Sequence, residues 1–466
     1  MTGAERLAEF ATALSLDDIP EDVVEDAKLH LLDVLGCGLA AEGYGLGTEG
    51  RVTMAELGGE PQASVIGHRE GMPAANAAFA NAVACHALDF DDTHAGCTCH
   101  ISVVVCPAAV AAAEACGASG PELLTAIVAG NEIVARIGMA APSAFHERGL
   151  HPTAVVGIFG ATAAVCRLRG LDAPRTTRAL GIAGSMGSGL FAYLSDGSAT
   201  KPIHAGWAAH GAVLAAALAA HGATGPAAVL EDRFGTYAVH AGSEDVDLEP
   251  QLADLGERWE TSNIAYKPYP ACHFIHASLG AVASIVEREA LAPGDIAEIV
   301  AVVPHPNYVQ TVLEPVEDKV APRTSYEAKF SLQYSAAAMV VHGRVGLESY
   351  EEAAIRDREV LDVAQRVTHE LAHFATYPQA LPGGARVRTT DGRELVELVP
   401  YQLGCAENPM SADDVRAKFR GNASRALGDD AVGALEGAVL GLDDLPGVEG
   451  AFAVLGEASA RQPAAA

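Results

Sequence analysis

The chain has 466 residues, half of them hydrophobic, and a formal net charge of −30 at pH 7. This length allows a large core and favours two domains. The strongly acidic balance excludes a nucleic-acid partner and an anionic membrane surface, because binding phosphates requires a basic surface. The longest apolar runs are interrupted by Glu114, Glu132 or Arg136, so we expect no membrane span.

The nine cysteines lack the dense spacing of a disulfide scaffold, which indicates free thiols in a reducing cytosol. Residues 1–15 contain Glu5 and Glu9 and no apolar stretch flanked by basic residues. No signal peptide is therefore expected, and we expect a cytoplasmic protein.

The first half of the chain is predicted to be helical almost throughout. Pro20 suits a first helical turn, and apolar residues recur after it at helical spacing. The segment Gly181–Gly189 is expected to be a hinge or packing connection. Further helices are predicted over residues 74–88, 103–116, 121–140, 154–168 and 206–221.

The pattern changes after about Ser262. Ile299–Val303 is mostly β-branched, and residues 385–398 alternate around Asp391-Gly392, which predicts a hairpin. Ser411 and Asp414 have capping-box spacing and should open a further helix. We therefore predict a mainly α fold, with a large all-helical domain of residues 1–264 completed by 401–466, and a smaller α+β domain of residues 265–400.

Several short segments combine histidine, lysine, tyrosine or acidic residues with glycine or proline. The first runs from His86 to His100 and follows a helix of small apolar residues, so its acids and histidines should lie beside the core. Polar groups placed there must be paired or used for chemistry. The others are His151-Pro152-Thr153, Lys201-Pro202-Ile203-His204-Ala205-Gly206, Tyr266 to His276, and Lys329 to Tyr334.

His151 and Lys201 stand at predicted helix starts, where a positive charge opposes the helix dipole. An anion is therefore expected near them. Any one of these histidines has an ordinary structural explanation, as a cap or a satisfied core imidazole. Together they predict a cationic pocket for a small di- or tricarboxylate, in which one histidine or lysine moves a proton.

The segment from His86 to His100 also contains residue types that bind metals, and its Asp-Phe-Asp-Asp is similar to the metal motif of terpene cyclases. Cys97-Thr98-Cys99 lacks the two-residue gap of a zinc knuckle, and an aromatic content of 5% argues against an aromatic-lined cyclase cavity. No Walker-type phosphate loop is present. We expect no metal and no cofactor, and a metal-dependent helical cyclase is the alternative of a different class.

In their order along the chain, these segments resemble the MmgE/PrpD family of 2-methylcitrate dehydratase, cis-aconitate decarboxylase and iminodisuccinate epimerase. The most specific marker is His86-Ala-Leu-Asp-Phe-Asp-Asp-Thr93-His94, and the resemblance extends to about residue 440. It implies a helical domain with a smaller α+β lid, an active site in the cleft between them, and a homodimer that needs no metal.

The resemblance also implies roles for individual residues. His100 would be the acid or base, Lys201 and Lys267 would hold carboxylates, and Tyr334 is a candidate proton relay. The implied catalytic set is His100, Asp89, Lys201, Lys267 and Tyr334. The implied substrate-binding set is Thr93, His151, His204, Cys272 and His276.

The expected reaction is dehydration of a hydroxylated di- or tricarboxylate similar to 2-methylcitrate, by α-proton abstraction and loss of the β-hydroxyl. Epimerisation or decarboxylation of a related acid, similar to iminodisuccinate or cis-aconitate, is the alternative within the family. Cys272-His273 stands where decarboxylase-type members have a histidine shortly after the Lys-x-aromatic-Pro element, which weakens a specific assignment as a cis-aconitate decarboxylase. A binding protein without turnover would leave these proton-transfer residues unused.

Overall fold

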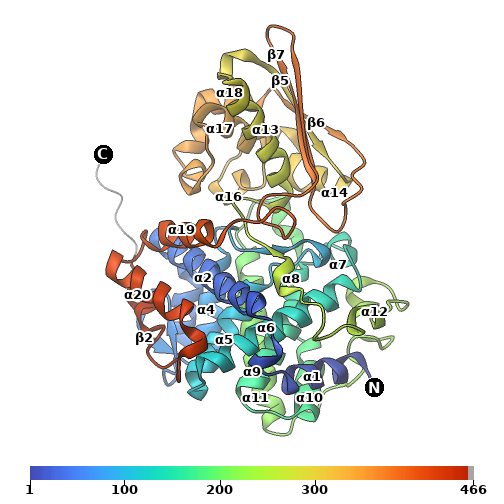
Figure 1. The fold of residues 1–466 in the computed structure, drawn as a ribbon, viewed down its shortest axis with the longest axis vertical. Coiled ribbons are helices and arrows are strands. Elements are labelled where there is room, and N and C mark those ends of the chain that lie inside the picture. The colour runs from blue at the N-terminus through green and yellow to red at the C-terminus, as the bar shows by residue number, and fades with distance from the viewer. Residues whose placement is uncertain (460–466) are drawn as a thin grey trace. The chain divides into compact units, whose positions relative to one another are not determined.

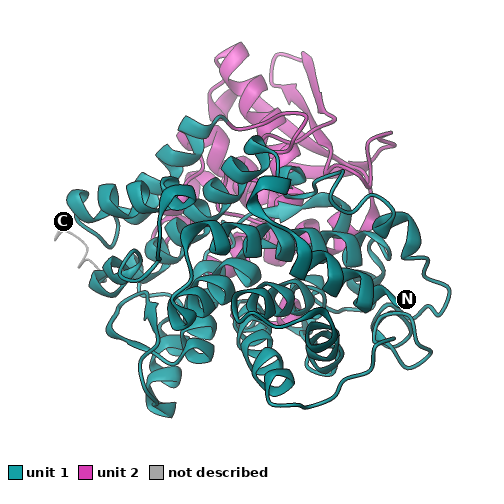
Figure 2. Cartoon of the chain, turned by 60° about the horizontal axis from the view of Figure 1, so that its bottom comes forward, with its two compact units in different colours: residues 1–192, 200–264, 411–466 teal, residues 193–199, 265–410 magenta. Residues whose placement is uncertain are grey.

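The computed structural model describes residues 1–459 and divides into two compact units. Unit 1 contains residues 1–192, 200–264 and the chain from 411 onward, whereas unit 2 contains residues 193–199 and 265–410 (Figure 2). The end of the predicted segment 401–466, residues 460–466, lies outside the described residues.

Unit 1 is built mainly of helices (Figure 1). Helix α11 packs against α4, α5 and α9, and α5 also packs against α4 and α9. The helices of this unit are α1 (Gly3–Ala13), α2 (Glu21–Gly43), α3 (Thr48–Leu57), α4 (Ala74–His86), α5 (Ser102–Cys116), α6 (Gly120–Met139), α7 (Ala144–Glu147), α8 (Pro152–Val155), α9 (Gly157–Leu168), α10 (Ala173–Gly184), α11 (Lys201–Ala220), α12 (Glu249–Leu252), α19 (Ala412–Ala423) and α20 (Asp429–Leu440).

Small residues let these helices approach closely. A Cβ at Gly206 of α11 would lie 2.5 Å from the side chain of Val83 in α4, and one at Gly160 of α9 would lie 2.2 Å from the carbonyl oxygen of Gly130 in α6. Either contact is too short for a larger residue. The glycine- and alanine-rich sequence thus explains why α4 and α11 lie close enough to share a site.

Most predicted helices of unit 1 are confirmed, with shifted ends. The prediction for 206–221 corresponds to α11, which begins earlier, at Lys201, and the prediction for 154–168 is divided between α8 and α9. The expectation of a connection over Gly181–Gly189 was partly wrong, because α10 continues to Gly184. Gly181 is a packing residue there, since its Cβ would lie 2.6 Å from the backbone of Gly225.

A short hairpin of unit 1 was not predicted. β1 (Ala63–Val65) pairs antiparallel with β2 (His68–Met72) around Gly67, whose φ is +72°. The charged, half-exposed residues of β2 hide the alternation that marks a strand. The short elements β3 (Thr93–His94) and β4 (Ile264–Ala265) complete the strands outside the main sheet.

Unit 2 contains a four-stranded sheet in the order β6-β5-β7-β8. β5 (Ile296–Val303) runs parallel to β6 (Val367–Leu371) and antiparallel to β7 (Gly383–Thr389). β7 pairs antiparallel with β8 (Glu394–Val399) through the predicted turn, where Gly392 has a φ of +90°. The helices of this unit are α13 (His276–Glu289), α14 (Pro306–Tyr308), α15 (Val316–Val320), α16 (Ser325–Ala328), α17 (Leu332–His342) and α18 (Arg358–Ala364).

Helix α13 packs against β7 and β8, and α17 packs against α13 and α18.

Two segments that the sequence placed in the helical domain belong to unit 2 instead, namely 193–199 and 401–410. The ring of Tyr193 contacts those of Tyr326 and Phe330, with centroids 6.4 and 6.3 Å apart. Gly404 accepts a hydrogen bond of 3.0 Å from the backbone N–H of Tyr266. These contacts explain the assignment.

Among the described helices, α11 is the one that is long and apolar enough to cross a membrane by length and composition. The sequence analysis expects no membrane-spanning segment. More than half of the apolar stretch is buried, and α11 packs against α4, α9 and α10. It begins at Lys201, which is 4% exposed and forms an ion pair. These are properties of a core helix.

Candidate active site

The candidate site of unit 1 begins where α4 ends. After His86 the chain passes through a loop in which Asp89 has a φ of +52°, a strained conformation for a residue other than glycine. Asp89, Asp91 and Asp92 are all buried, with at most 1% exposed. Such buried carboxylates require partners, which neighbouring helices supply.

Lys201, the first residue of α11, is the partner of Asp89. Its Nζ lies 2.7 Å from Oδ1 of Asp89 and 3.3 Å from Nε2 of His100. The sequence predicts an anion near this helix start, and in unit 1 the carboxylate of Asp89 lies there. A buried ammonium next to an imidazole nitrogen can exchange a proton with it or bind a substrate anion.

The ring of His100 is oriented through its other nitrogen. Nδ1 lies 2.9 Å from the carbonyl oxygen of Asp92, 3.2 Å from Oγ1 of Thr93 and 3.3 Å from Oδ2 of Asp91. The backbone N–H of His100 donates to Oγ1 of Thr153 at 3.0 Å. Since acceptors surround Nδ1, we infer that it carries the hydrogen of the neutral ring. Nε2 then presents its lone pair to Lys201.

Asp91 links His100 to a second imidazole. Both of its oxygens lie 2.9 Å from Nδ1 of His86, which is fully buried. Burial opposes ionisation of Asp91, but the adjacent His86 and His100 outweigh it and hold the pKa of this carboxyl well below its usual range. Neither His86 nor Asp91 was in the predicted site set, although both lie inside the marker segment.

His151 and His204 lie beside this pair, with their Nδ1 atoms 3.2 Å apart. The ring of His151 stacks on that of His86, with centroids 5.6 Å apart and an angle of 9°. Burial, followed by the charge of Lys201, lowers the pKa of His151 well below its ordinary value. Burial, followed by the charges of His86 and Lys201, lowers the pKa of His204 to about 4. Both rings are therefore neutral near pH 7.

A further layer of contacts holds the loop. His30 of α2 lies with Nδ1 2.8 Å from Oδ2 of Asp92, and Oδ1 of Asp92 accepts from the backbone N–H of Ser102 at 3.3 Å. The sequence analysis missed His30 because it stands on a helix face without a motif. Its apolar helical neighbours give no signal of this role.

Unit 1 therefore brings together the predicted residues Asp89, Thr93, His100, His151, Lys201 and His204. The remaining predicted site residues, Lys267, Cys272, His276 and Tyr334, belong to unit 2.

Within unit 2, Lys267 is fully buried and Cys272 is partly exposed. Nε2 of His276 lies 3.1 Å from the carbonyl oxygen of Ala271. The hydroxyl of Tyr334 donates to the carbonyl oxygen of Ser349 at 2.7 Å, and burial, followed by the charge of Asp357, raises its pKa. A proton relay through Tyr334 would have to replace that hydrogen bond.

Among the described residues, two overlapping groups of side chains in unit 1 have the spacing of metal ligands. In each group, one ligand atom per residue lies within 4.8 Å of the others. The groups are His86, His100 and His151, and His86, Asp89, Asp91 and His100. The ammonium of Lys201 already contacts Asp89 and His100, which opposes the binding of a second cation.

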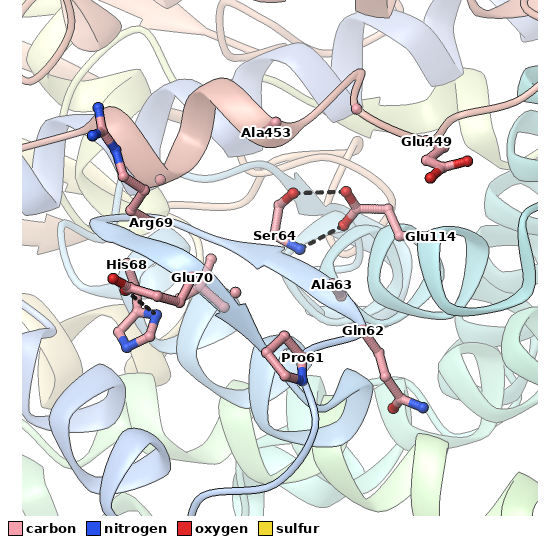
Figure 3. Close-up of a pocket in the computed structure, with 14 residues that line it drawn as sticks. Pro61, Gln62, Ala63, Ser64, His68, Arg69, Glu70, Glu114, Glu449 and Ala453 are labelled. Atoms are coloured by element: carbon pink, nitrogen blue, oxygen red, sulfur yellow. Dashed lines mark hydrogen bonds and ion pairs between the residues drawn. The ribbon is translucent and has the colours of Figure 1, made fainter.

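A pocket elsewhere in unit 1 is less suited to chemistry (Figure 3). It has a volume of about 290 Å³ and is lined by β1, β2 and Glu114. Figure 3 shows both carboxylate oxygens of Glu114 bound to Ser64, at 2.8 Å from its backbone nitrogen and 2.7 Å from Oγ. Glu114 is thus satisfied by structural hydrogen bonds, unlike the imidazole cluster.

Comparison with known proteins identifies the family of this chain. The MmgE/PrpD N-terminal domain matches residues 5–249 and the MmgE/PrpD C-terminal domain matches residues 269–444. Human cis-aconitate decarboxylase is 31% identical over 460 residues, covering 94% of this chain and 91% of that protein.

Two fungal relatives are similar over the same extent. The cis-aconitate decarboxylase of Aspergillus terreus is 29% identical over 465 residues, covering 94% of this chain and 93% of that protein. A cis-aconitate decarboxylase-like protein of Aspergillus oryzae is 28% identical over 460 residues, covering 94% of each chain. Because both family domains match and the similarity spans almost the whole chain, this protein belongs to the MmgE/PrpD family and is an enzyme of the lyase type.

Proposed function

We propose that this enzyme decarboxylates an unsaturated tricarboxylate similar to cis-aconitate. The observation that carries the proposal is the buried contact of 3.3 Å between Nζ of Lys201 and Nε2 of His100. It places a carboxylate-binding cation beside a proton-transfer group. The names of the relatives support decarboxylation over the dehydration that the sequence favours.

The proposed step begins when a substrate carboxylate binds the ammonium of Lys201, which Asp89 holds at 2.7 Å in the free enzyme. The C–C bond to a carboxylate on the carbon next to the alkene breaks, and CO2 leaves. The electron pair moves into the alkene and onto the conjugated carboxylate. Nε2 of His100, which carries no proton in the free enzyme, takes one up from solvent before this step, and that proton then forms the new C–H bond, so that one C–C bond is replaced by one C–H bond.

The environment of unit 1 favours this charge movement. Lys201 and His100 are both buried, and a fixed cation stabilises developing negative charge more strongly in a poorly solvated site than in water. In the neutral pair one Nδ1 donates to the other, so one of the rings of His151 and His204 keeps its hydrogen on Nε2 and can donate it to a further carboxylate oxygen without repelling the ammonium. Asp91 compensates the positive charge of His100 whenever that ring carries two protons.

Dehydration of a 2-methylcitrate-like acid is the second candidate, because Cys272-His273 departs from the decarboxylase-type pattern. Both reactions need a cation over a carboxylate while charge develops on the adjacent carbon. The same residues would serve both, with His100 removing the α-proton instead of supplying one.

The test is to incubate the purified enzyme in deuterated water with cis-aconitate and, separately, with 2-methylcitrate. Decarboxylation releases CO2 and places deuterium in the product, whereas dehydration forms an alkene without CO2. Exchange of deuterium into the substrate, without release of CO2 and without formation of an alkene, would indicate epimerisation. Absence of CO2 from cis-aconitate, with alkene formed from 2-methylcitrate, would overturn the first proposal in favour of the second.

Several expectations from the family resemblance stay predictions. They include a lid role for the α+β unit, the roles of Lys267, Cys272, His276 and Tyr334, a homodimer, a cytoplasmic location and independence from metals and cofactors. Activity that survives EDTA would argue against a metal-dependent cyclase. Light scattering measures the mass of the particle in solution, and replacing Lys267 with methionine tests its carboxylate-binding role through KM.

A further inference from the structure

We propose that Lys201 occupies a latent transition-metal site, so that removing its ammonium lets the surrounding acids and histidines bind a first-row divalent metal ion. The inference concerns unit 1 alone and does not depend on which carboxylate the enzyme converts. The ligand class is a borderline cation such as Co²⁺ or Zn²⁺, which accepts both imidazole and carboxylate donors.

The spacing of the donor atoms carries the first step. His86, Asp89, Asp91 and His100 each offer one atom within 4.8 Å of the other three. Two ligands of one ion lie at most about 4.2 Å apart when each bond is about 2.1 Å long. Nε2 of His100 and Oδ1 of Asp89 are 4.0 Å apart, so this pair already satisfies the limit.

The second step is the orientation of the imidazoles. Metal-binding histidines usually donate their second ring N–H to a carboxylate, which fixes the ring and its tautomer. Asp91 lies 2.9 Å from Nδ1 of His86 and 3.3 Å from Nδ1 of His100, so when a metal ion binds the other nitrogens of these rings Asp91 orients them instead of serving as a ligand. Nε2 of His86 is buried and makes no hydrogen bond with the described residues. Nε2 of His86 is thus a lone-pair donor on an oriented ring, and it remains available to a metal ion.

The third step is the position of the resident cation. Nζ of Lys201 contacts Oδ1 of Asp89 and Nε2 of His100. These are the two atoms whose separation already suits two ligands of one metal ion. The ammonium therefore stands among the donors, where it competes with a divalent ion both for space and by charge repulsion.

The variant that tests this is Lys201→Ala, prepared free of metal and titrated with Co²⁺ in the absence of any substrate. We expect visible absorption bands of Co²⁺ in a low-coordinate nitrogen and oxygen site, together with a higher unfolding temperature at saturating metal. The wild-type protein should show neither change. Because no substrate is present, the result is independent of the proposed decarboxylation.

Matched variants assign the ligands. Adding Asp89→Asn or His100→Gln to Lys201→Ala should weaken Co²⁺ binding by at least about tenfold. Adding His210→Gln should not, since that histidine binds the carbonyl oxygen of Ala75 on α4 and lies outside the ligand groups. If Lys201→Ala fails to fold, Lys201→Ser provides the same opening with a small polar side chain.

The proposal is overturned by any of three results. These results are the absence of Co²⁺ binding in the folded Lys201 variants, equally tight binding in the wild type, and binding that neither Asp89→Asn nor His100→Gln changes. Binding confined to the Lys201 variants and lost with either ligand substitution supports it.

Discussion

Lys418 donates a hydrogen bond to the carbonyl oxygen of Phe90 at 2.8 Å, and its ammonium lies 3.9 Å from the centre of the Phe90 ring. The same Nζ is 2.9 Å from Oδ1 of Asp33 on α2. Phe90 follows Asp89, the residue with positive φ that binds Lys201. Helix α19, which comes late in the chain, thus supports the loop that carries the candidate site.

We predict that Lys418→Met lowers kcat by about 10- to 100-fold, because the loop no longer holds Asp89 in its strained conformation. It should also lower the unfolding temperature, since Asp33 remains buried without its partner. Lys418→Arg keeps the charge and should recover much of the rate. Steady-state kinetics and thermal unfolding measure both effects, and a stability loss with unchanged kcat and KM would show a purely structural role.

Replacing His100 with glutamine should reduce kcat by about 10²- to 10⁴-fold, the usual contribution of an acid–base group. Glutamine can keep a polar contact near Lys201 but cannot transfer the proton. Circular dichroism and thermal unfolding should remain close to wild type, and His210→Gln provides a matched control. Near-normal turnover by His100→Gln would remove this residue from the proposed step.

Asp91→Asn should lower kcat by roughly 10²-fold or more, because an amide can donate to Nδ1 of His100 and stabilise the wrong tautomer. The pKa of Asp91 is depressed in the folded protein, so its stabilising contribution is complete above the ordinary carboxyl range and is lost only in stronger acid. The ionisation of Asp91 itself does not change between about pH 5 and 8, so any pH dependence of the stability loss of Asp91→Asn in this range comes from its neighbours His86 and His100. Wild-type kcat and unfolding temperature in Asp91→Asn at pH 7 would contradict the assignment of Asp91 as the carboxylate that orients His100.

The histidines predict a different pH dependence. The pKa values of His146 and His204 are lowered to about 4, and that of His151 is also lowered, in each case first by burial. The unfolded chain binds protons at these groups below about pH 6.5, whereas the folded chain does not. Stability should therefore fall as the pH drops from about 6.5 towards 4.

Thermal unfolding at pH 7, 6 and 5 checks this expectation. The variant His204→Gln should flatten the decline, because one group that stays neutral in the folded state has been removed. An unfolding temperature that is constant or rises over this interval would contradict the direction of the shifts.

Much of the local structure could be predicted from the sequence. Helical periodicity located α4, α5 and α6, Asp391-Gly392 located a hairpin, and the capping box of Ser411 located the start of α19. The hairpin of β1 and β2 was missed because its residues do not alternate. Helical periodicity, turn residues and capping boxes therefore predict helices and hairpins only in the segments that contain them.

The sequence by itself determined which chemical groups are available, because the order of its histidine, lysine and acid segments identified the family. It also indicated that an anion lies near Lys201. Only the tertiary structure decided that this anion is Asp89, 112 positions away in the chain, and that Asp91 joins His86 to His100. Those pairings depend on how closely α11 packs on α4 through Gly206, and packing of distant helices has no signature in local periodicity.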